Sequence, residues 1–206
     1  LSVYLRAKVP EKVIGCFLSL GAQAGTDAEA VEHFKKIMAY AERVNFNPDY
    51  QLLVSQLMLI NTNRAKDFAL LLLQSEGKLD INQTVDAFLR HNDVKSTTNI
   101  LLQYLTPRGD RDEDAALQTK RLEINLVYAP NVADAIMESS DYNFSKYDRL
   151  RIANMCERAG LPQRALEHYT ELTDIKRVLS NAASINPQFL LEYFGQMTPE
   201  NCLECL

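Results

Sequence analysis

Few residues in this sequence have the type and spacing that chemistry requires, and the first candidate is a C-x-x-C pair, Cys202 and Cys205. Such a pair can form half of a tetrahedral zinc site or a redox couple. The sequence has no second C-x-x-C, and its histidines stand singly, at His33, His91 and His168. Cys202 also lies on an apolar stripe behind Pro199, where packing explains a small side chain. We therefore expect no metal site and no redox pair.

The charged residues 106–114 provide two further candidates. Arg108–Asp110 spells RGD, a triplet known for adhesion outside cells, but a solvated connector is the better interpretation in a chain with no readable export signal. Glu113 and Asp114 are adjacent, so on a helix their side chains would diverge by about 100° and form no acid-base couple. The glycines are isolated and build no phosphate-binding loop or nucleophile motif. We expect no catalytic residue, no cofactor and no enzymatic activity.

The stretch 147–177 shows the kind of structural element from which this chain is built, and on which any functional residue must lie. Its first half has apolar residues at helical spacing, Gly160 can end that helix in a left-handed conformation, and Pro162 suits the first turn of another. The second half places Leu166 and Leu172 on one stripe. Because the turn is so short, the two helices must lie against each other, and the stretch predicts an antiparallel helical hairpin.

Prolines mark similar helix starts along the chain. Five are followed by apolar residues three and seven positions later, and these are Pro10, Pro130, Pro162, Pro187 and Pro199. Pro48 is a looser case, and Pro107 predicts a loop. Further segments with helical periodicity are 27–44, 64–75 with Asn63 as N-cap, 80–90, 97–105 and 115–128. The pattern predicts an all-α fold, a right-handed α-solenoid of about six stacked antiparallel hairpins over residues 1–206.

Composition is that of an ordinary soluble folded protein, with 47% hydrophobic and 24% charged residues. The net charge of -5 gives no general electrostatic reason to bind nucleic acid or anionic membrane. The longest strongly apolar run, Phe68–Leu73, is far shorter than the about 20 residues that cross a bilayer. Four cysteines without a signal peptide fit a reducing compartment, with Cys16 and Cys156 as small buried side chains. We expect a cytosolic protein, and a segment of something longer because no Met begins it and Leu206 ends it within an apolar pattern.

Four stretches of the sequence resemble one family. They are LSVYLRAKVPEKVIGCF at the start, LQTKRLEINLVYAPNVADAIM at 117–137, YDRLRIANMCERAGLPQRALEHYTELTDIKRV at 147–178, and YFGQMTPENCLECL at the end. Their residues, order and approximate spacing closely resemble the clathrin heavy chain, in the part of its leg called the ankle and running into the distal leg. The resemblance implies a continuous α-solenoid of short helices within a chain that joins two others at a distant hub.

The function that the resemblance implies is mechanical. The segment would be a rigid spacer that holds the terminal propeller away from the lattice and packs against other clathrin heavy chains in coated pits and coated vesicles. It would thereby support endocytosis and intracellular vesicle transport on the cytosolic side of the membrane, without inserting into it. The ankle of family members also receives adaptor and spindle-associated proteins. Because the hub and the light-chain site lie outside these residues, we expect the fragment to be monomeric.

Two stretches depart from the family pattern, and two other classes of protein stay open. Residues 21–33 look like an inserted loop and residues 106–114 differ in character, which puts partner contacts at both corners in doubt. A peptide-binding scaffold of the tetratricopeptide kind would also be helical, but its W-x-x-L-G-x-x-Y pattern is absent and the chain has no Trp. A vacuolar sorting subunit would share the hairpins but not the long literal matches at 117–137 and 147–178.

Overall fold

The computed structural model describes residues 9–75, 77–139, 144–180 and 185–205. These ranges contain thirteen α-helices, two short 3₁₀ helices and no strand, which confirms the all-α prediction. None of the described helices is both long enough and apolar enough to span a membrane. The chain divides into two compact units, Leu1–Tyr104 and Leu105–Leu206. A single continuous array over residues 1–206 stays a prediction.

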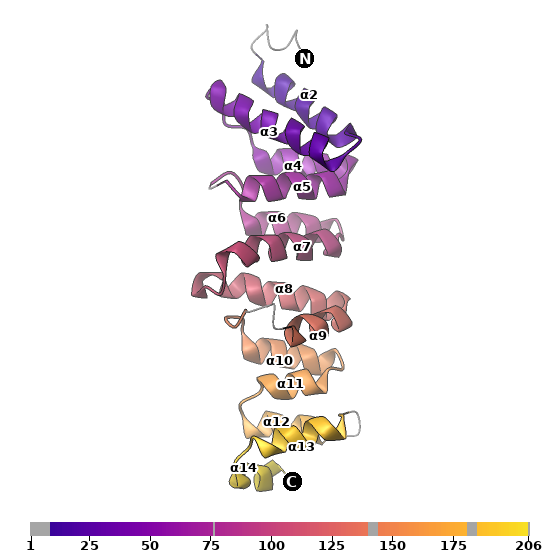
Figure 1. Ribbon diagram of the computed structural model, residues 1–206, viewed down its shortest axis with the longest axis vertical. Coiled ribbons are helices and arrows are strands. Elements are labelled where there is room, and N and C mark those ends of the chain that lie inside the picture. The colour runs from indigo at the N-terminus through magenta and orange to yellow at the C-terminus, as the bar shows by residue number, and fades with distance from the viewer. Residues whose placement is uncertain (1–8, 76, 140–143, 181–184, 206) are drawn as a thin grey trace. The chain divides into compact units, whose positions relative to one another are not determined.

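Unit 1, Leu1–Tyr104, is built from antiparallel helix pairs. Its described helices are α2 (Pro10–Gln23), α3 (Asp27–Arg43), α4 (Tyr50–Ile60), α5 (Thr62–Leu73), α6 (Ile81–Arg90) and α7 (Val94–Leu105). α2 packs along α3, and α4 packs along α5 (Figure 1). These two hairpins stack through contacts of α2 with α4 and of α3 with α5. The stacked hairpin predicted from the sequence is therefore the repeating element of this unit.

Asn61 makes the connection between α4 and α5 as short as one residue. It ends α4, and its side-chain oxygen accepts a hydrogen bond from the backbone N–H of Arg64 at 3.1 Å, which caps α5. The predicted cap, Asn63, is wrong by two residues because the extended backbone that an N-cap needs occurs at Asn61 (φ −156°, ψ 100°). Asp80 caps α6 in the same way, by accepting from the N–H of Gln83 at 2.8 Å.

Two helices of unit 1 end at asparagines in the left-handed conformation. Asn45 follows α3 with φ of 49°, and Asn92 follows α6 with φ of 57°. After Asn45, the N–H of Phe46 donates to the carbonyl of Ala41 at 2.9 Å, and a bond of the same kind follows Asn92. The sequence analysis looked for glycine at helix ends and missed both residues, although asparagine also tolerates this conformation.

The loop predicted at residues 21–33 is wrong. α2 continues to Gln23 and α3 begins at Asp27, so only residues 24–26 connect the two helices. A Cβ added to Gly21 would lie 2.4 Å from the Phe34 ring. Gly21 is therefore a point of close packing between two helices, which the sequence alone could not distinguish from a loop glycine.

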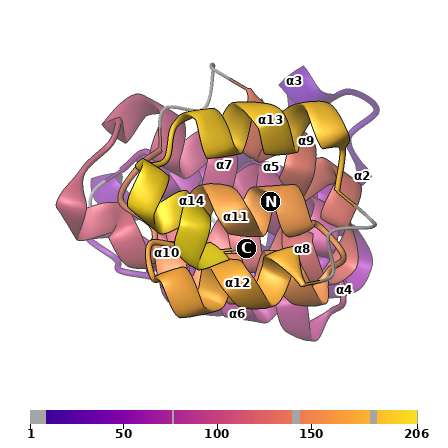
Figure 2. The same cartoon turned by 90° about the horizontal axis from the view of Figure 1, so that it is seen from below.

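Unit 2, Leu105–Leu206, repeats the hairpin with shorter helices. Its described elements are η1 (Thr106–Arg108), η2 (Asp112–Asp114), α8 (Ala115–Tyr128), α9 (Pro130–Glu138), α10 (Arg149–Arg158), α11 (Pro162–His168), α12 (Leu172–Leu179), α13 (Pro187–Gly195) and α14 (Pro199–Cys205). α8 pairs with α9 and α10 with α11, and the pairs meet through α8 and α10. Figure 2 shows α10 and α12 on the opposite side of this unit from α13. All five predicted proline starts are first-turn prolines, as predicted.

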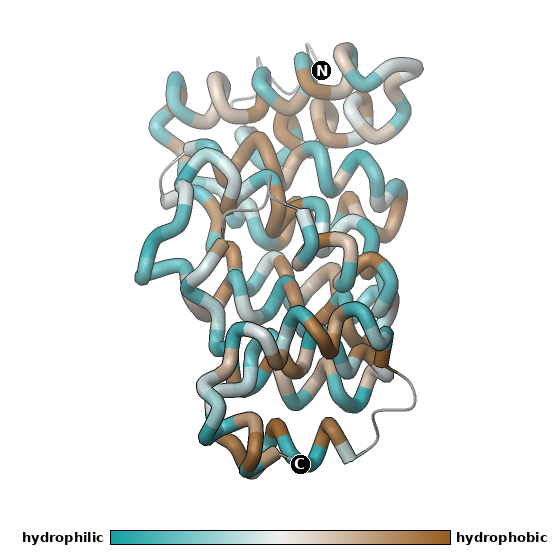
Figure 3. The backbone as a smooth tube through the Cα atoms, turned by 60° about the horizontal axis from the view of Figure 1, so that its bottom comes forward, coloured by the Kyte–Doolittle hydropathy of each residue, from teal (hydrophilic) through white to brown (hydrophobic). Residues whose placement is uncertain are grey.

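The core of unit 2 lies between its two sets of helices. The buried apolar residues come from the helices α8 to α12 and from Tyr169 and Ile185, which lie outside them. The most enclosed are Ala133, Ile152, Ala153, Cys156, Ala165 and Leu166. Hydrophobic and hydrophilic segments alternate along the coils of the chain (Figure 3). The helices α8 to α12 thus bury one face against their neighbours and leave the other for solvent.

The stretch 147–177 contains three helices instead of the predicted two. α11 ends at His168, and Tyr169 then takes an extended conformation (φ −70°, ψ 139°) before α12 begins at Leu172. The extended residue turns the Tyr169 hydroxyl toward α10, where it donates to Glu157 Oε2 at 2.8 Å. Apolar periodicity continues through this break, which is why the sequence pattern did not reveal it.

The helix stop predicted at Gly160 is confirmed. Gly160 has φ of 77°, its N–H donates to the carbonyl of Glu157 at 3.2 Å, and the N–H of Leu161 donates to the carbonyl of Cys156 at 2.9 Å. These two bonds form a Schellman motif, which requires the left-handed residue.

Replacing Gly160 with alanine should lower the free energy of unfolding by about 1 kcal/mol, because an L-residue is disfavoured at this φ. Chemical denaturation followed by circular dichroism measures the change. Gly195→Ala is the matched control, since Gly195 has no positive φ and open space around its Cβ position. Equal effects of the two substitutions would contradict the assigned role of Gly160.

Candidate functional site

The two cysteines of the C-x-x-C motif lie on α14 in a packing environment. The Cys202 thiol donates to the carbonyl of Phe194 at 3.4 Å, and Cys205 packs against the apolar core of unit 2. Both are free thiols and half-buried. Within residues 9–75, 77–139, 144–180 and 185–205, no three His, Cys, Asp or Glu side chains are arranged to hold a metal ion. The position of Cys202 agrees with the packing interpretation.

The other two cysteines differ in burial. Cys156 has no exposed surface, as predicted, whereas Cys16 is only half-buried. Burial raises the pKa of the Cys156 thiol to about 12. Such a thiol stays protonated near neutral pH and is a poor nucleophile.

Of the three histidines, His168 alone lies within a buried polar contact among the described residues. His33 is half-buried and His91 is exposed. The Nδ1 atom of His168 lies 2.7 Å from the carbonyl of Arg164, and since a carbonyl only accepts, Nδ1 carries the proton. Nε2 lies 2.7 Å from the Tyr147 hydroxyl, which donates to it when the imidazole is neutral. This pair fixes the segment before α10 against the end of α11.

Lowering the pH should therefore reduce the free energy of unfolding of unit 2, because His168 takes up a proton more readily in the unfolded chain. Burial lowers the pKa of His168 below its ordinary value, so the unfolded chain binds this proton more readily than the folded one. The stability contribution is complete above a pH of about 6.5 and falls as pH drops below that value toward the folded-state pKa. Urea denaturation between pH 7.5 and 5.5 should show a steeper loss for the natural chain than for His168→Gln. Parallel pH profiles would contradict this prediction.

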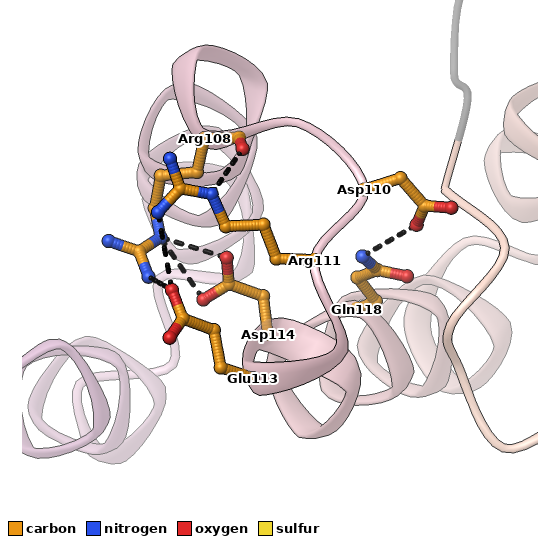
Figure 4. A network of polar contacts seen from close by, with 6 residues as sticks. All are labelled: Arg108, Asp110, Arg111, Glu113, Asp114 and Gln118. Carbon is orange, nitrogen blue, oxygen red and sulfur yellow. Dashed lines mark hydrogen bonds and ion pairs between the residues drawn. The ribbon is translucent and has the colours of Figure 1, made fainter.

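The RGD triplet lies in the connection that precedes α8, where Gly109 and Asp110 are exposed and Arg108 is half-buried, as the solvated-connector interpretation predicts. Arg108 Nε donates to Asp114 Oδ2 at 2.8 Å, and its NH2 atom donates to Glu113 at 2.6 Å (Figure 4). The Asp114 side chain is only 4% exposed. Gly109, with φ of 73°, reverses the chain between η1 and η2. The prediction that Pro107 lies in a loop is wrong, because Pro107 belongs to the 3₁₀ helix η1. The rest of the prediction for 106–114 agrees with the structure, in which most of these residues are exposed.

Glu113 and Asp114 converge on one cation instead of diverging. The sequence argument assumed a regular α-helix, but both residues lie in η2, and Arg108 reaches them from the preceding turn. The Arg108 guanidinium donates charge-assisted hydrogen bonds to both carboxylates. The pair is thus a structural ion pair, and it gives no proton-transfer couple.

A second set of hydrogen bonds joins the 106–114 turn and α8 to the segment that precedes α10. The backbone N–H groups of Ser145 and Lys146 donate to the side chains of Asp110 and Gln118, each at 2.9 Å. The N–H of Asp148 donates to Thr119 Oγ1 at 2.9 Å. We call residues 144–148 the clamped segment. None of these bonds follows from sequence periodicity, because they join residues about 30 positions apart in irregular backbone.

A third set of polar contacts stabilises the break between α11 and α12. Arg177 donates to Glu157 Oε2 at 2.9 Å, to Asp174 at 2.7 Å and to the Tyr169 hydroxyl at 3.1 Å. The bond from Arg177 lowers the pKa of Glu157, while burial and the nearby Glu157 raise the pKa of Tyr169 to about 12. These groups hold α10 to α12 and leave no side chain in an activated protonation state.

One cavity among the described residues of unit 2 is smaller than a usual ligand pocket. A cavity of about 50 Å³ lies among residues that include Gln118, Leu122, Met137 and Tyr147. Ligand pockets for small molecules usually occupy about 300–1,000 Å³. The polar side chains of unit 2 thus serve to join helices, and the fold presents the features of a helical-repeat scaffold.

The comparison with known families agrees with this class. The family described as "Clathrin: Region in Clathrin and VPS" matches residues 72–206. The chain therefore belongs to this clathrin and VPS repeat family.

The similar proteins are clathrin heavy chains from distant organisms. The chain is 46% identical over 209 residues to the clathrin heavy chain of Dictyostelium discoideum, 45% identical over 207 residues to that of Drosophila melanogaster, and 42% identical over 207 residues to clathrin heavy chain 2 of Homo sapiens. Each alignment covers 100% of this chain and 11% or 12% of the relative. The resemblance noted in the sequence is thus confirmed over the whole chain, which spans about an eighth of the curated relatives it matches.

Proposed function

We propose that this chain is a rigid structural segment in the leg of a clathrin heavy chain, and that it has no enzymatic activity. The observation that carries the proposal is sequence identity of 42–46% to clathrin heavy chains along the whole chain. The fold adds a physical reason, because a helix pair that contacts only its neighbours makes an extended support and not a catalytic cleft.

In this role the segment spaces the terminal propeller from the lattice. Its surface packs against other clathrin heavy chains in coated pits and coated vesicles, on the cytosolic side of the membrane, and so supports endocytosis and vesicle transport. Weak contacts along many legs sum to a stable coat by multivalency. Adaptor and spindle-associated proteins are the candidate partners at this part of the leg, and nucleic acid is not. By itself the fragment is monomeric, which light scattering can measure.

Two other functions receive less support. A peptide-binding scaffold of the tetratricopeptide kind would require that family's repeat pattern, which this sequence lacks. A vacuolar sorting subunit would fit the family description, which names VPS as well as clathrin. The identity to clathrin heavy chains from several organisms favours the clathrin function over both.

Deletion of one hairpin from an intact heavy chain tests the spacer function. Removing residues 149–171 takes out α10, α11 and the link to α12. If the leg must have a set length and stiffness, the shortened chains should still associate with one another but should fail to form closed coats of normal size in electron micrographs. A chain carrying Arg158→Ala, at an exposed position of α10, is the control. Coats of unchanged diameter from the deletion variant would overturn the proposal.

A further inference from the structure

The clamped segment, residues 144–148, is held mainly through its own backbone. Three of its N–H groups donate to side chains of the preceding turn and of α8: Ser145 to Asp110, Lys146 to Gln118 and Asp148 to Thr119. The last of these residues is also the N-cap of α10, where its side chain accepts from the N–H of Arg151 at 3.0 Å. The position at which α10 starts therefore depends on this set of bonds.

Among the three residues that donate these bonds, Ser145 has a side-chain hydroxyl that an enzyme can modify. Its side chain is exposed, and it lies outside any helix, so a modifying enzyme can reach it. The Ser145 hydroxyl donates to Asp110 Oδ2 at 2.5 Å, while Asp110 Oδ1 accepts from the Ser145 N–H at 2.9 Å and from Gln118 at 3.1 Å. The Asp110 carboxylate thus accepts hydrogen bonds from both the backbone N–H and the hydroxyl of Ser145.

The hydroxyl contacts one carboxylate, and the next residue, Lys146, pairs with another. Asp110 contacts the hydroxyl directly, and Asp112 forms an ion pair with Lys146 at 3.1 Å. Burial would raise the pKa of Asp110, but the bonds from Ser145 and Gln118 together with the charge of Lys146 outweigh it, so the pKa lies below its usual value. Asp110 is therefore ionised near neutral pH.

We propose that Ser145 is a phosphorylation site whose modification releases the clamped segment from the turn and from α8. In the reaction, the Ser145 Oγ attacks the γ-phosphorus of a nucleoside triphosphate bound to a protein kinase. The Oγ–P bond forms, the bond from that phosphorus to the β-γ bridging oxygen breaks, a nucleoside diphosphate leaves, and the hydroxyl proton passes to a base of the kinase.

The phosphate would act by replacing a donor with an acceptor. The hydrogen bond from Oγ to Asp110 disappears, and a group with a charge of about −1.5 to −2 faces the carboxylate. Asp110, Asp112 and Lys146 have a summed charge of −1 before modification, so the single lysine cannot neutralise the phosphate as well. Repulsion would break the bond from the Ser145 N–H first, and the neighbouring bonds to Gln118 and Thr119 would then lose their geometry.

Two other exposed serines in the described part of the chain have a different arrangement. The hydroxyls of Ser19 and Ser180 donate to backbone carbonyls four residues back in the sequence, at 2.9 and 2.8 Å. A phosphate on Ser180 would add the same charge to unit 2 without facing Asp110. Ser180 therefore provides a matched control position.

The first experiment installs phosphoserine at position 145 of the full chain during translation and measures amide hydrogen exchange. The amides of Ser145, Lys146 and Asp148 should exchange at least tenfold faster than in the unmodified chain. Phosphoserine at position 180 should leave these three rates unchanged. Adding Asp110→Asn to the chain phosphorylated at 145 should recover part of the lost protection, because the direct repulsion is gone. Unchanged exchange with phosphoserine at 145 would overturn the release mechanism.

The second experiment asks whether the site is used. Mass spectrometry of the heavy chain purified from its own cells, with phosphatase inhibitors present, should detect phosphate on Ser145 in the tryptic peptide that ends at Lys146. The chain carrying Ser145→Ala should lose that signal. Absence of phosphate from this peptide, in samples where other phosphopeptides of the same protein are detected, would overturn the assignment of the site.

Discussion

Replacing Leu166 with alanine should lower the free energy of unfolding of unit 2 by about 2–5 kcal/mol. Leu166 is only 1% exposed and packs in the core between α10, α11 and their neighbours. The substitution removes buried methyl groups and leaves a cavity that the tightly connected helices can fill only in part. Thermal and urea denaturation of the full chain measure the effect.

The matched control is Leu191→Ala on α13, where the leucine is 72% exposed. Substitutions of this kind usually change stability by less than about 0.5 kcal/mol. If both variants melted at the temperature of the natural chain, Leu166 would not be part of a packed core, and the hairpin packing described for unit 2 would be wrong.

The second large effect is expected at Gly21, where alanine should destabilise unit 1 by about 1–3 kcal/mol. The added Cβ would lie 2.4 Å from the fully buried Phe34 ring, which also stacks on Phe68 with ring centroids 4.7 Å apart. The ring therefore cannot move away without disturbing a second aromatic side chain.

Gly15 offers a control in the same helix. It lies within α2, and a Cβ added there meets nothing within 4 Å. Gly15→Ala should stabilise the helix by about 0.5–1 kcal/mol, because alanine loses less conformational freedom than glycine. Opposite signs for the two substitutions are thus expected, and destabilisation of equal size at both positions would contradict the close-packing role of Gly21.

The sequence predicted most helix starts because they depend on local rules. Proline at the first turn and an aspartate cap such as Asp80 act within a few residues, so spacing is sufficient to locate them. Where a start was misplaced, as at Asn63, the error was two residues, since two asparagines compete for the same role and backbone geometry decides between them.

Features that depend on packing between distant residues were not predictable. The glycine at position 21 has the same local signature as a loop glycine until Phe34 is known to lie against it. The break at Tyr169 depends on a hydroxyl reaching Glu157 on another helix. The clamped segment depends on bonds between the 106–114 turn, α8 and residues 145–148. These are tertiary contacts, and periodicity carries no information about them.

The residues of a short sequence motif can have a purely structural role in the fold. Arg108 illustrates the difference between motif and site. The sequence predicted a residue of a solvated connector, and in the fold Arg108 also joins two carboxylates and closes a turn.

The most direct test of the account is a chimera. Residues of the Dictyostelium discoideum clathrin heavy chain that align with this chain are exchanged for residues 1–206, and the chimera is expressed in cells that lack their own heavy chain. If this chain is an interchangeable segment of the leg, the chimera should assemble into closed coats of normal diameter in electron micrographs. A chimera that is stable and associates through its hub but forms no closed coats would contradict the account.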